Sequence, residues 1–294
     1  RLFYLYVSQS DIVDGYDPLI PEAVKNVLEA LKKQPKVFFI FVSCLDDLIG
    51  TDHEALLEEL GNSYPGIQFR VCHMNPISLG SKTPPPVSIQ NNLYSLLEPA
   101  QDRDSGVNAV GNLEPVALSS ELYPFLNTYG AGELRHISRY TVYEQYQEMS
   151  RSRANLVIGP PGRQAAGQME ERLGIPWVFI PVSYDMEEIE GGYARLKQLL
   201  APDAEDCFDF APARERALKA VERARRRVGD IPVIIDASAT VQPFGMAKAL
   251  LTYGFQVTRV EAQDCMPFDR EHMEWLVRNH PKVEICQPEH HRAV

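Results

Sequence analysis

The 294-residue sequence has few cysteines, and their spacing excludes several kinds of site. Cys44, Cys72, Cys207, Cys265 and Cys286 are scattered singly, with no C-x-x-C pair and no cysteine–histidine spacing typical of zinc. No metal site is therefore complete on local spacing. A disulfide framework requires a denser set of cysteines, so we expect the protein to reside in the reducing cytoplasm.

The sequence also lacks the common nucleotide-binding motifs and any excess of positive charge. Neither G-x-G-x-x-G nor G-x-x-x-x-G-K-[ST] occurs, which disfavours nicotinamide, flavin and ATP sites of those kinds. The 29 basic residues against 40 acidic ones give a net charge of -11, which repels phosphate backbones and anionic lipids. No apolar run approaches the roughly 20 residues of a membrane-spanning helix. We expect neither a nucleic acid nor a membrane partner.

Short apolar runs alternate with helical patterns along the chain. The clearest run, Val37 to Val42 (VFFIFV), is apolar on both faces, as in a buried parallel strand. This alternation predicts an α/β protein built from βα repeats with parallel sheets. Further strands are expected at 68–72, 108–110, 133–138, 155–158, 177–180, 231–236, 256–261 and 283–286, and helices at 21–33, from 51, 120–130, 164–173 and 244–253.

Two polar stretches divide the chain into three expected α/β domains. The stretches are 98–106 (EPAQDRDSG) and 201–212, and we place the boundaries within them. The arginine-rich run 223–227 lies on a helix with Glu215 and Glu222, and we interpret it as a solvated linker helix rather than a phosphate site. The expected domains are 1–103, with its N-terminal part missing, 104–207, and 208–294, which we expect to be incomplete.

Loops that follow strands are the places where open α/β sheets bind ligands. The loop 159–162 (GPPG) is a poor phosphate cradle, because two prolines remove backbone N–H donors. The loop 236–240 is a small polar turn. The loop Ser43 to Asp52 differs from both, because Cys44 places a thiol at the carboxyl end of a buried strand. A lone cysteine there is either a packed apolar residue or a ligand.

The residues around this thiol resemble a known family. Cys44 with Ile49, Gly50 and Asp52 is similar to the C-x-x-x-x-I-G-D-D segment of the nitrogenase component 1 oxidoreductases. The resemblance covers nearly the whole chain and implies three Rossmann-like α/β domains, cut at both ends. It includes 11–15 (DIVDG), 155–157 (NLV) and 169–177 (MEERLGIPW), which follow the family's order.

The resemblance implies a subunit that pairs with a homologous subunit and accepts electrons from an ATP-dependent iron–sulfur reductase. In that family, the cysteine matching Cys44 ligates an iron–sulfur cluster at the subunit interface, so Cys44 is the implied cofactor and metal ligand. The family's other cluster cysteines precede the segment matching Asp11, and none lies there in this sequence. One thiolate does not complete a cluster of about four ligands. We therefore expect the isolated chain to hold no cofactor and to be inactive.

The substrate is left open by the sequence. The family's cysteine for the iron–molybdenum cofactor falls on Gly159, so dinitrogen is not the expected substrate. The alternative is a non-catalytic scaffold, or a protein of the same fold that binds a small molecule or metallocofactor, with Cys44 merely packed. Asp46, Asp47 and His73 fall near the same sheet edge, and we interpret them as solvated surface. We expect Cys44 to be reactive, and Cys72 and Cys286 to be buried within strands.

Overall fold

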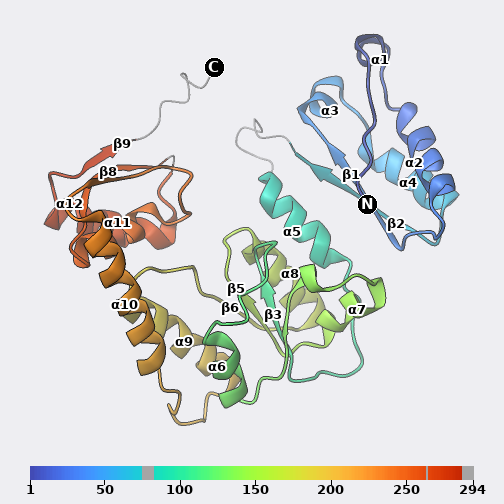
Figure 1. The fold of residues 1–294 in the computed structure, drawn as a ribbon. Coiled ribbons are helices and arrows are strands. Elements are labelled where there is room, and N and C mark those ends of the chain that lie inside the picture. The colour runs from blue at the N-terminus through green and yellow to red at the C-terminus, as the bar shows by residue number, and fades with distance from the viewer. Residues whose placement is uncertain (75–82, 263, 287–294) are drawn as a thin grey trace.

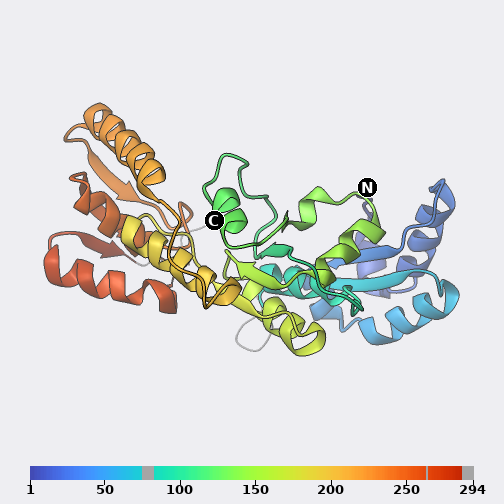
Figure 2. The same cartoon turned by 90° about the horizontal axis from the view of Figure 1, so that it is seen from below.

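A computed structural model describes residues 1–74, 83–262 and 264–286, without the side chains of Asp47 and Leu48. The described strands form three separate sheets, and every strand pair is parallel, which confirms the predicted α/β class. Figures 1 and 2 show the sheets following one another along an elongated molecule. The division into domains at residues 103 and 207 stays a prediction.

The first sheet pairs two strands. Helices of the same segment cover one face, and residues of the other face pack against the apolar core of the second sheet. In the register, Val37 lies opposite Gln68 and Val42 opposite His73. An apolar cluster joins the sheet to two amphipathic helices, with Leu28 and Leu60 almost completely buried. The elements are α1 (Gln9–Asp14), α2 (Leu19–Ala30), β1 (Val37–Val42), α3 (Cys44–Ile49), α4 (His53–Ser63) and β2 (Gln68–His73).

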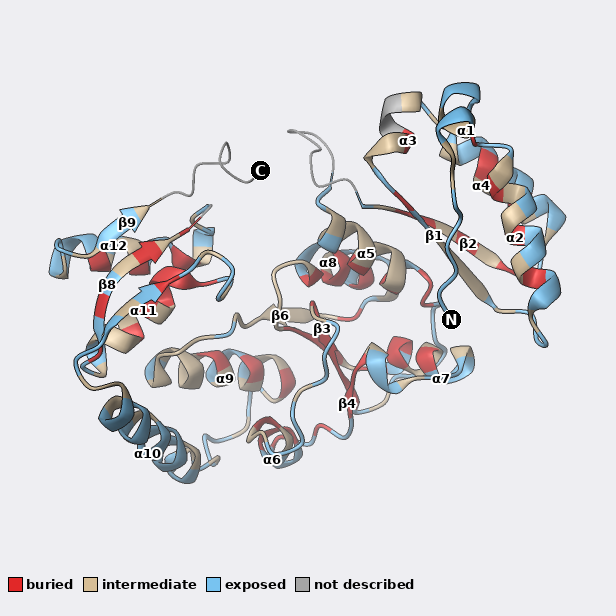
Figure 3. Ribbon diagram, turned by 45° about the horizontal axis from the view of Figure 1, so that its top comes forward, coloured by how far each residue is buried: buried red, intermediate tan, exposed pale blue. Residues whose placement is uncertain are grey.

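The second sheet has the order β4-β3-β5-β6, so β4 lies on one side of β3, and β5 and β6 lie on the other side. Strands β3 and β5 are buried along their whole length (Figure 3). Helices α6 and α9 pack on one face, and α5, α7 and α8 pack on the other. The elements are α5 (Pro85–Ser95), β3 (Val107–Val110), α6 (Leu122–Thr128), β4 (Leu134–Arg135), α7 (Tyr143–Gln147), β5 (Ala154–Val157), α8 (Gly162–Leu173), β6 (Trp177–Phe179) and α9 (Met186–Leu200).

The third sheet, β7-β8-β9, follows a long connecting helix, α10, in which no residue is buried. This exposure agrees with the interpretation of the arginine-rich run as solvated (Figure 3). Phe244 and Leu276 anchor α11 and α12 in the core beside this sheet. The elements are α10 (Ala211–Val228), β7 (Pro232–Ile235), α11 (Pro243–Thr252), β8 (Gln256–Glu261), the 3-10 helix η3 (Pro267–Asp269), α12 (Arg270–Asn279) and β9 (Glu284–Cys286).

The structure differs from the local predictions at several places, and helices α1, α7, α9 and α12 were not predicted. The expected loop after β1 contains α3, and the expected strand at 133–138 is reduced to Leu134–Arg135 by the 3-10 helix Ile137–Arg139. Helix α4 begins at His53 rather than at residue 51, because the Asp52 carboxylate caps it by accepting the N–H groups of the first turn. Cys286 is partly exposed rather than buried, because β9 lies at the edge of its sheet. None of the helices in the described segments is both long and apolar enough to cross a membrane.

Candidate functional site

Cys44 lies directly beyond the carboxyl end of β1, as the sequence predicts, and is the first residue of α3. Ser43 caps this six-residue helix in a capping box with Asp46, and Gly50 ends it in the left-handed conformation at φ 73°. The Cys44 side chain is partly exposed. Phe41, one residue before the end of β1, is 53% exposed. The thiol therefore lies within three residues of an exposed aromatic side chain.

Asp46 is a buried structural residue, which contradicts the expectation of a solvated surface position. It is 3% exposed, and its Oδ2 accepts the N–H of Ser43 at 3.1 Å. Its Oδ1 lies 3.4 Å from Nε2 of His53, whose ring meets the ring of His73 edge-to-face at 4.9 Å between centroids. Burial, together with the Asp46 carboxylate, raises the pKa of Tyr16. Asp46 thus fixes the turn that carries Cys44, while the Asp47 side chain lies outside the described residues.

Cys72 on β2 is packed, as predicted for a strand interior. It is 1% exposed, and burial raises the pKa of its thiol. The Nδ2 of Asn92 donates to the Val71 carbonyl at 2.9 Å and lies 3.3 Å from the Cys72 sulfur. These contacts tie α5 to β2 and leave Cys44 as the accessible thiol of the first sheet.

The described residues do not complete a metal site. They contain no group of three or more histidine, cysteine, aspartate or glutamate side chains that could hold a metal ion. Among the described residues, Cys44 could contribute one thiolate to a cluster, and any further ligands would lie outside them.

The strand order of the second sheet reverses between β3 and β5, and we call the carboxyl ends of these two strands the switch point. Glycine backbones fill the space there. A Cβ added to Gly159 would lie 2.2 Å from the Gly111 carbonyl oxygen, and one added to Gly111 would lie 2.3 Å from that of Gly159. A Cβ on Gly162 would lie 2.5 Å from Gly111 Cα. No real Cβ is found at such distances, so the two strand ends touch backbone to backbone. A side chain at residue 159, cysteine included, does not fit this arrangement.

A charged cluster that the sequence analysis missed joins the second and third sheets. His272 on α12 lies between two carboxylates, with Nε2 2.8 Å from Glu188 Oε1 and Nδ1 2.9 Å from Asp269 Oδ1. Lys248 on α11 donates to the same Glu188 oxygen at 2.8 Å, and Ser183 donates to the other oxygen at 2.7 Å. Glu188 belongs to α9, so this cluster connects elements that belong to different sheets.

The charges in this cluster stabilise one another. The hydrogen bonds to Asp269 and Glu188 raise the pKa of His272 to about 9. The hydrogen bond from His272 lowers the pKa of Glu188 to about 2, against the effect of burial. Burial opposes the charge of Lys248, but the neighbouring carboxylates raise its pKa. His272 is therefore an imidazolium at neutral pH and acts as an ionic link rather than a free base.

Comparisons with known proteins agree with this architecture. The profile of the family described as nitrogenase component 1 type oxidoreductase matches residues 1–293. The nitrogenase iron-molybdenum cofactor biosynthesis protein NifE of Clostridium pasteurianum is 21% identical over 198 residues, which are 65% of this chain and 42% of that protein. The chain thus spans less than half of the length of this curated relative.

Two solved structures share the fold. Nitrogenase Cp1 at pH 6.5 superposes with a TM-score of 0.70 at 14% identity, covering 96% of this chain and 66% of that chain. Nitrogenase Cp1 at pH 5 gives a TM-score of 0.58 at 16% identity, covering 89% of this chain and 53% of that chain. At these identities the likeness concerns the fold alone.

Proposed function

Because the chain belongs to the nitrogenase component 1-type oxidoreductase family, we propose that it is a subunit of a nitrogenase-like oxidoreductase. In this proposal it pairs with a homologous subunit and accepts electrons from an ATP-dependent iron–sulfur reductase. Cys44 supplies one thiolate to an iron–sulfur cluster at the subunit interface, which would carry the electrons when bound. The assembly works in the cytoplasm, where its unpaired cysteines stay reduced.

The position of Cys44 is the observation that carries this proposal. A cluster ligand at a subunit interface must be accessible, rigidly held and close to a surface that a partner can cover. Cys44 is partly exposed, the buried Asp46 fixes its turn, and Phe41, three residues earlier in the sequence, has an exposed aromatic side chain. Among the described residues no complete ligand set surrounds it, so in this proposal further ligands come from outside them, from the rest of this protein or from the partner.

The closed switch point supports a substrate other than dinitrogen. When this sequence is compared with the family, residue 159 matches the cysteine that holds the iron–molybdenum cofactor. Gly159 leaves no room for a Cβ beside the backbone of Gly111. This chain therefore does not fit a cofactor ligated from residue 159, and we derive no step through such a group.

The proposal is tested with the full-length chain co-purified with its partner subunit. The Cys44→Ala variant should lose most of the iron and the electron paramagnetic resonance signal of the reduced cluster. The matched control is Cys207→Ala, which removes an exposed thiol from the segment between α9 and α10 and should leave both signals unchanged. Unchanged iron in Cys44→Ala would exclude Cys44 as a cluster ligand.

A second candidate is a scaffold that holds a metallocofactor without reducing a substrate. The similarity to NifE, named as a cofactor biosynthesis protein, favours this candidate. The two functions differ when reductase and MgATP are added to the iron-loaded complex. An oxidoreductase subunit passes electrons through its cluster to a substrate repeatedly, whereas a scaffold shows no continued ATP-dependent electron consumption with any offered substrate.

A further inference from the structure

The connecting helix α10 concentrates positive charge in an acidic protein. Its 18 residues include seven arginines and lysines and two glutamates, a net charge of +5. The whole chain carries a net charge of -11, so the residues outside α10 carry -16. No residue of the helix is buried. This charge is therefore available at the surface.

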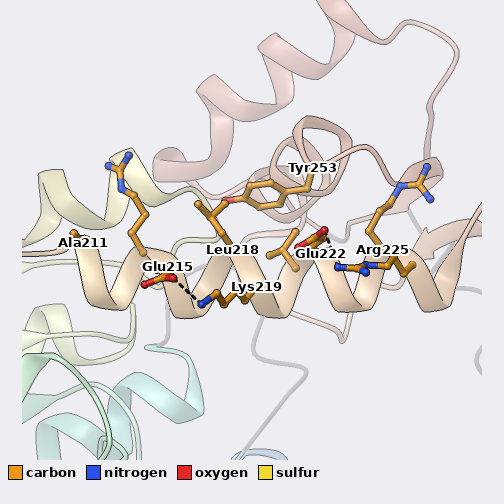
Figure 4. Close-up of a pocket in the computed structure, with 10 residues that line it drawn as sticks. Ala211, Glu215, Leu218, Lys219, Glu222, Arg225 and Tyr253 are labelled. Carbon is orange, nitrogen blue, oxygen red and sulfur yellow. Dashed lines mark ion pairs between the residues drawn. The ribbon is translucent and has the colours of Figure 1, made fainter.

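Part of this charge is neutralised within the chain. Figure 4 shows the ion pairs between Lys219 and Glu215, at 2.6 Å, and between Arg226 and Glu222, at 2.7 Å. Arg214 similarly pairs with Glu190 at 2.6 Å. In the part of the chain that the structure describes, no ion pair involves the three remaining exposed arginines of the helix body. These are Arg216, Arg223 and Arg227, which we call the arginine face.

The arginine face is one continuous stripe. Its members are spaced by seven and four residues, which places them on the same side of an α-helix over about 16 Å. The other side of α10 carries Leu218 and faces Tyr253, with which it lines a groove of about 590 Å³ (Figure 4). Arg216, Arg223 and Arg227 do not line this groove, so they point away from the rest of the chain.

We propose that the arginine face binds an acidic surface of a partner protein. Guanidinium groups form strong, often bidentate hydrogen bonds with carboxylates, and three of them in a row match a helix with glutamates at the same spacing. Between Arg216 and Arg223 this side carries the small Ala220, with Lys219 at its edge held by Glu215, so a partner can approach the guanidinium groups. The partner is recognised by carboxylates at complementary positions.

Charge favours a protein over a phosphate polymer or an anionic membrane. The residues outside α10 carry a net charge of -16, which repels an extended polyanion that reaches beyond the helix. A compact acidic patch on a protein can contact the helix alone. Glu215 and Glu222 pair with Lys219 and Arg226, so they do not neutralise the arginine face itself. A protein surface therefore satisfies the local charge pattern better.

This surface is independent of the proposed cluster site. Helix α10 and helix α3 lie on opposite sides of the molecule, with the second sheet between them (Figure 1). A partner on the arginine face would leave Cys44 uncovered. The inference therefore stands or falls separately from the proposed function.

The test uses a synthetic helical peptide of 18 residues with three glutamates on one face, spaced four and seven residues apart. Fluorescence anisotropy should show binding to the chain that weakens at least about tenfold in the variant Arg216→Gln/Arg223→Gln/Arg227→Gln. The matched control, Arg214→Gln/Lys219→Gln/Arg226→Gln, removes the same charge from the same helix and should stay within about threefold. Replacing the arginine face with lysines keeps the charge but not the bidentate geometry, so binding should fall between that of the wild type and that of the glutamine variant. Circular dichroism checks that every variant keeps its helices.

Three results would overturn the proposal. The first is that the peptide does not bind, or that both triple glutamine variants lose the same affinity. An equal loss would mean that the peptide responds to the total charge of the helix and not to the arginine face. The second is equal binding of a peptide with the same composition and its glutamates spread around the helix. The third is tighter binding of a 20-base-pair DNA duplex or of phosphatidylglycerol vesicles than of the peptide.

Discussion

His272 and Glu188 form a 2.8 Å hydrogen-bonded ion pair, although 84 residues separate them in the sequence. His272 belongs to α12 beside the third sheet, and Glu188 belongs to α9 on the second. Asp269 holds the other ring nitrogen, while the N–H groups of Phe244 and Gly245 bind Asp269. This pair therefore links the packing of one sheet to that of the next.

Removing the His272 ring should weaken this link. His272→Ala leaves Asp269 and Glu188 without their shared cation, although Lys248 still pairs with Glu188. Because a broken buried pair costs up to 3–5 kcal/mol and this one is partly exposed, we expect a loss of about 2 kcal/mol in urea unfolding. Faster amide hydrogen exchange in α11 and α12 should accompany it. The control is His280→Ala, whose ring only stacks on Trp275 and should change neither measurement appreciably.

The stability of the link should depend on pH in a defined window. The pKa of His272 is raised to about 9, so its contribution is complete below the unfolded value near 6.5 and is lost as the pH rises through 9. The pKa of Glu188 is lowered to about 2, so its contribution is complete above about 4.5 and is lost as the pH falls through 2. The melting temperature of the wild type should exceed that of His272→Ala most between about pH 5 and 6.5. A difference that persists unchanged above about pH 10 would contradict the ionic account.

The sequence predicted helices and strands that have a clear local pattern, such as an apolar run. It did not predict contacts between residues that lie far apart in the sequence. Val37–Val42 forms the strand that its six consecutive apolar residues predict, but only Val42 is fully buried and Phe41 is 53% exposed. Helix α3 was missed, although Ser43 and Asp46 have capping-box spacing and Gly50 follows as a C-cap, signals that could have revealed it.

The ionic cluster carried no such local signal. His272 and Asp269 are three residues apart on one element, but Glu188 and Lys248 come from other helices, and only the packing of the sheets brings the four together. The position of Cys44 could be predicted because it depends on one strand end. The burial of Asp46 could not, because it depends on contacts with Ser43, with His53 on the next helix, and with Tyr16.

A side chain introduced at Gly159 should destabilise the second sheet. In Gly159→Ala the new Cβ meets the Gly111 carbonyl at 2.2 Å, so the two strand ends must separate, at a cost of about 2–3 kcal/mol in urea unfolding. The control is Gly167→Ala on α8, where a Cβ meets no atom within 4 Å, and it should stabilise the protein by about 0.5–1 kcal/mol. Equal stability of Gly159→Ala and the wild type would show that the switch point opens readily and can admit a cofactor ligand.

Alkylation of the native protein should separate the five thiols by burial. Cys207 is exposed and Cys44 partly exposed, so iodoacetamide should label these two first, as peptide mapping by mass spectrometry can measure. Partial burial raises the pKa of Cys265, and the neighbouring Glu284 carboxylate raises that of Cys286, so both should react more slowly at pH 8. Cys72 should be labelled only after denaturation, because β1 and α5 enclose it and burial raises its pKa. Labelling of Cys44 as slow as that of Cys72 would mean that the turn after β1 is closed, and a partner's cluster could then not reach this thiol.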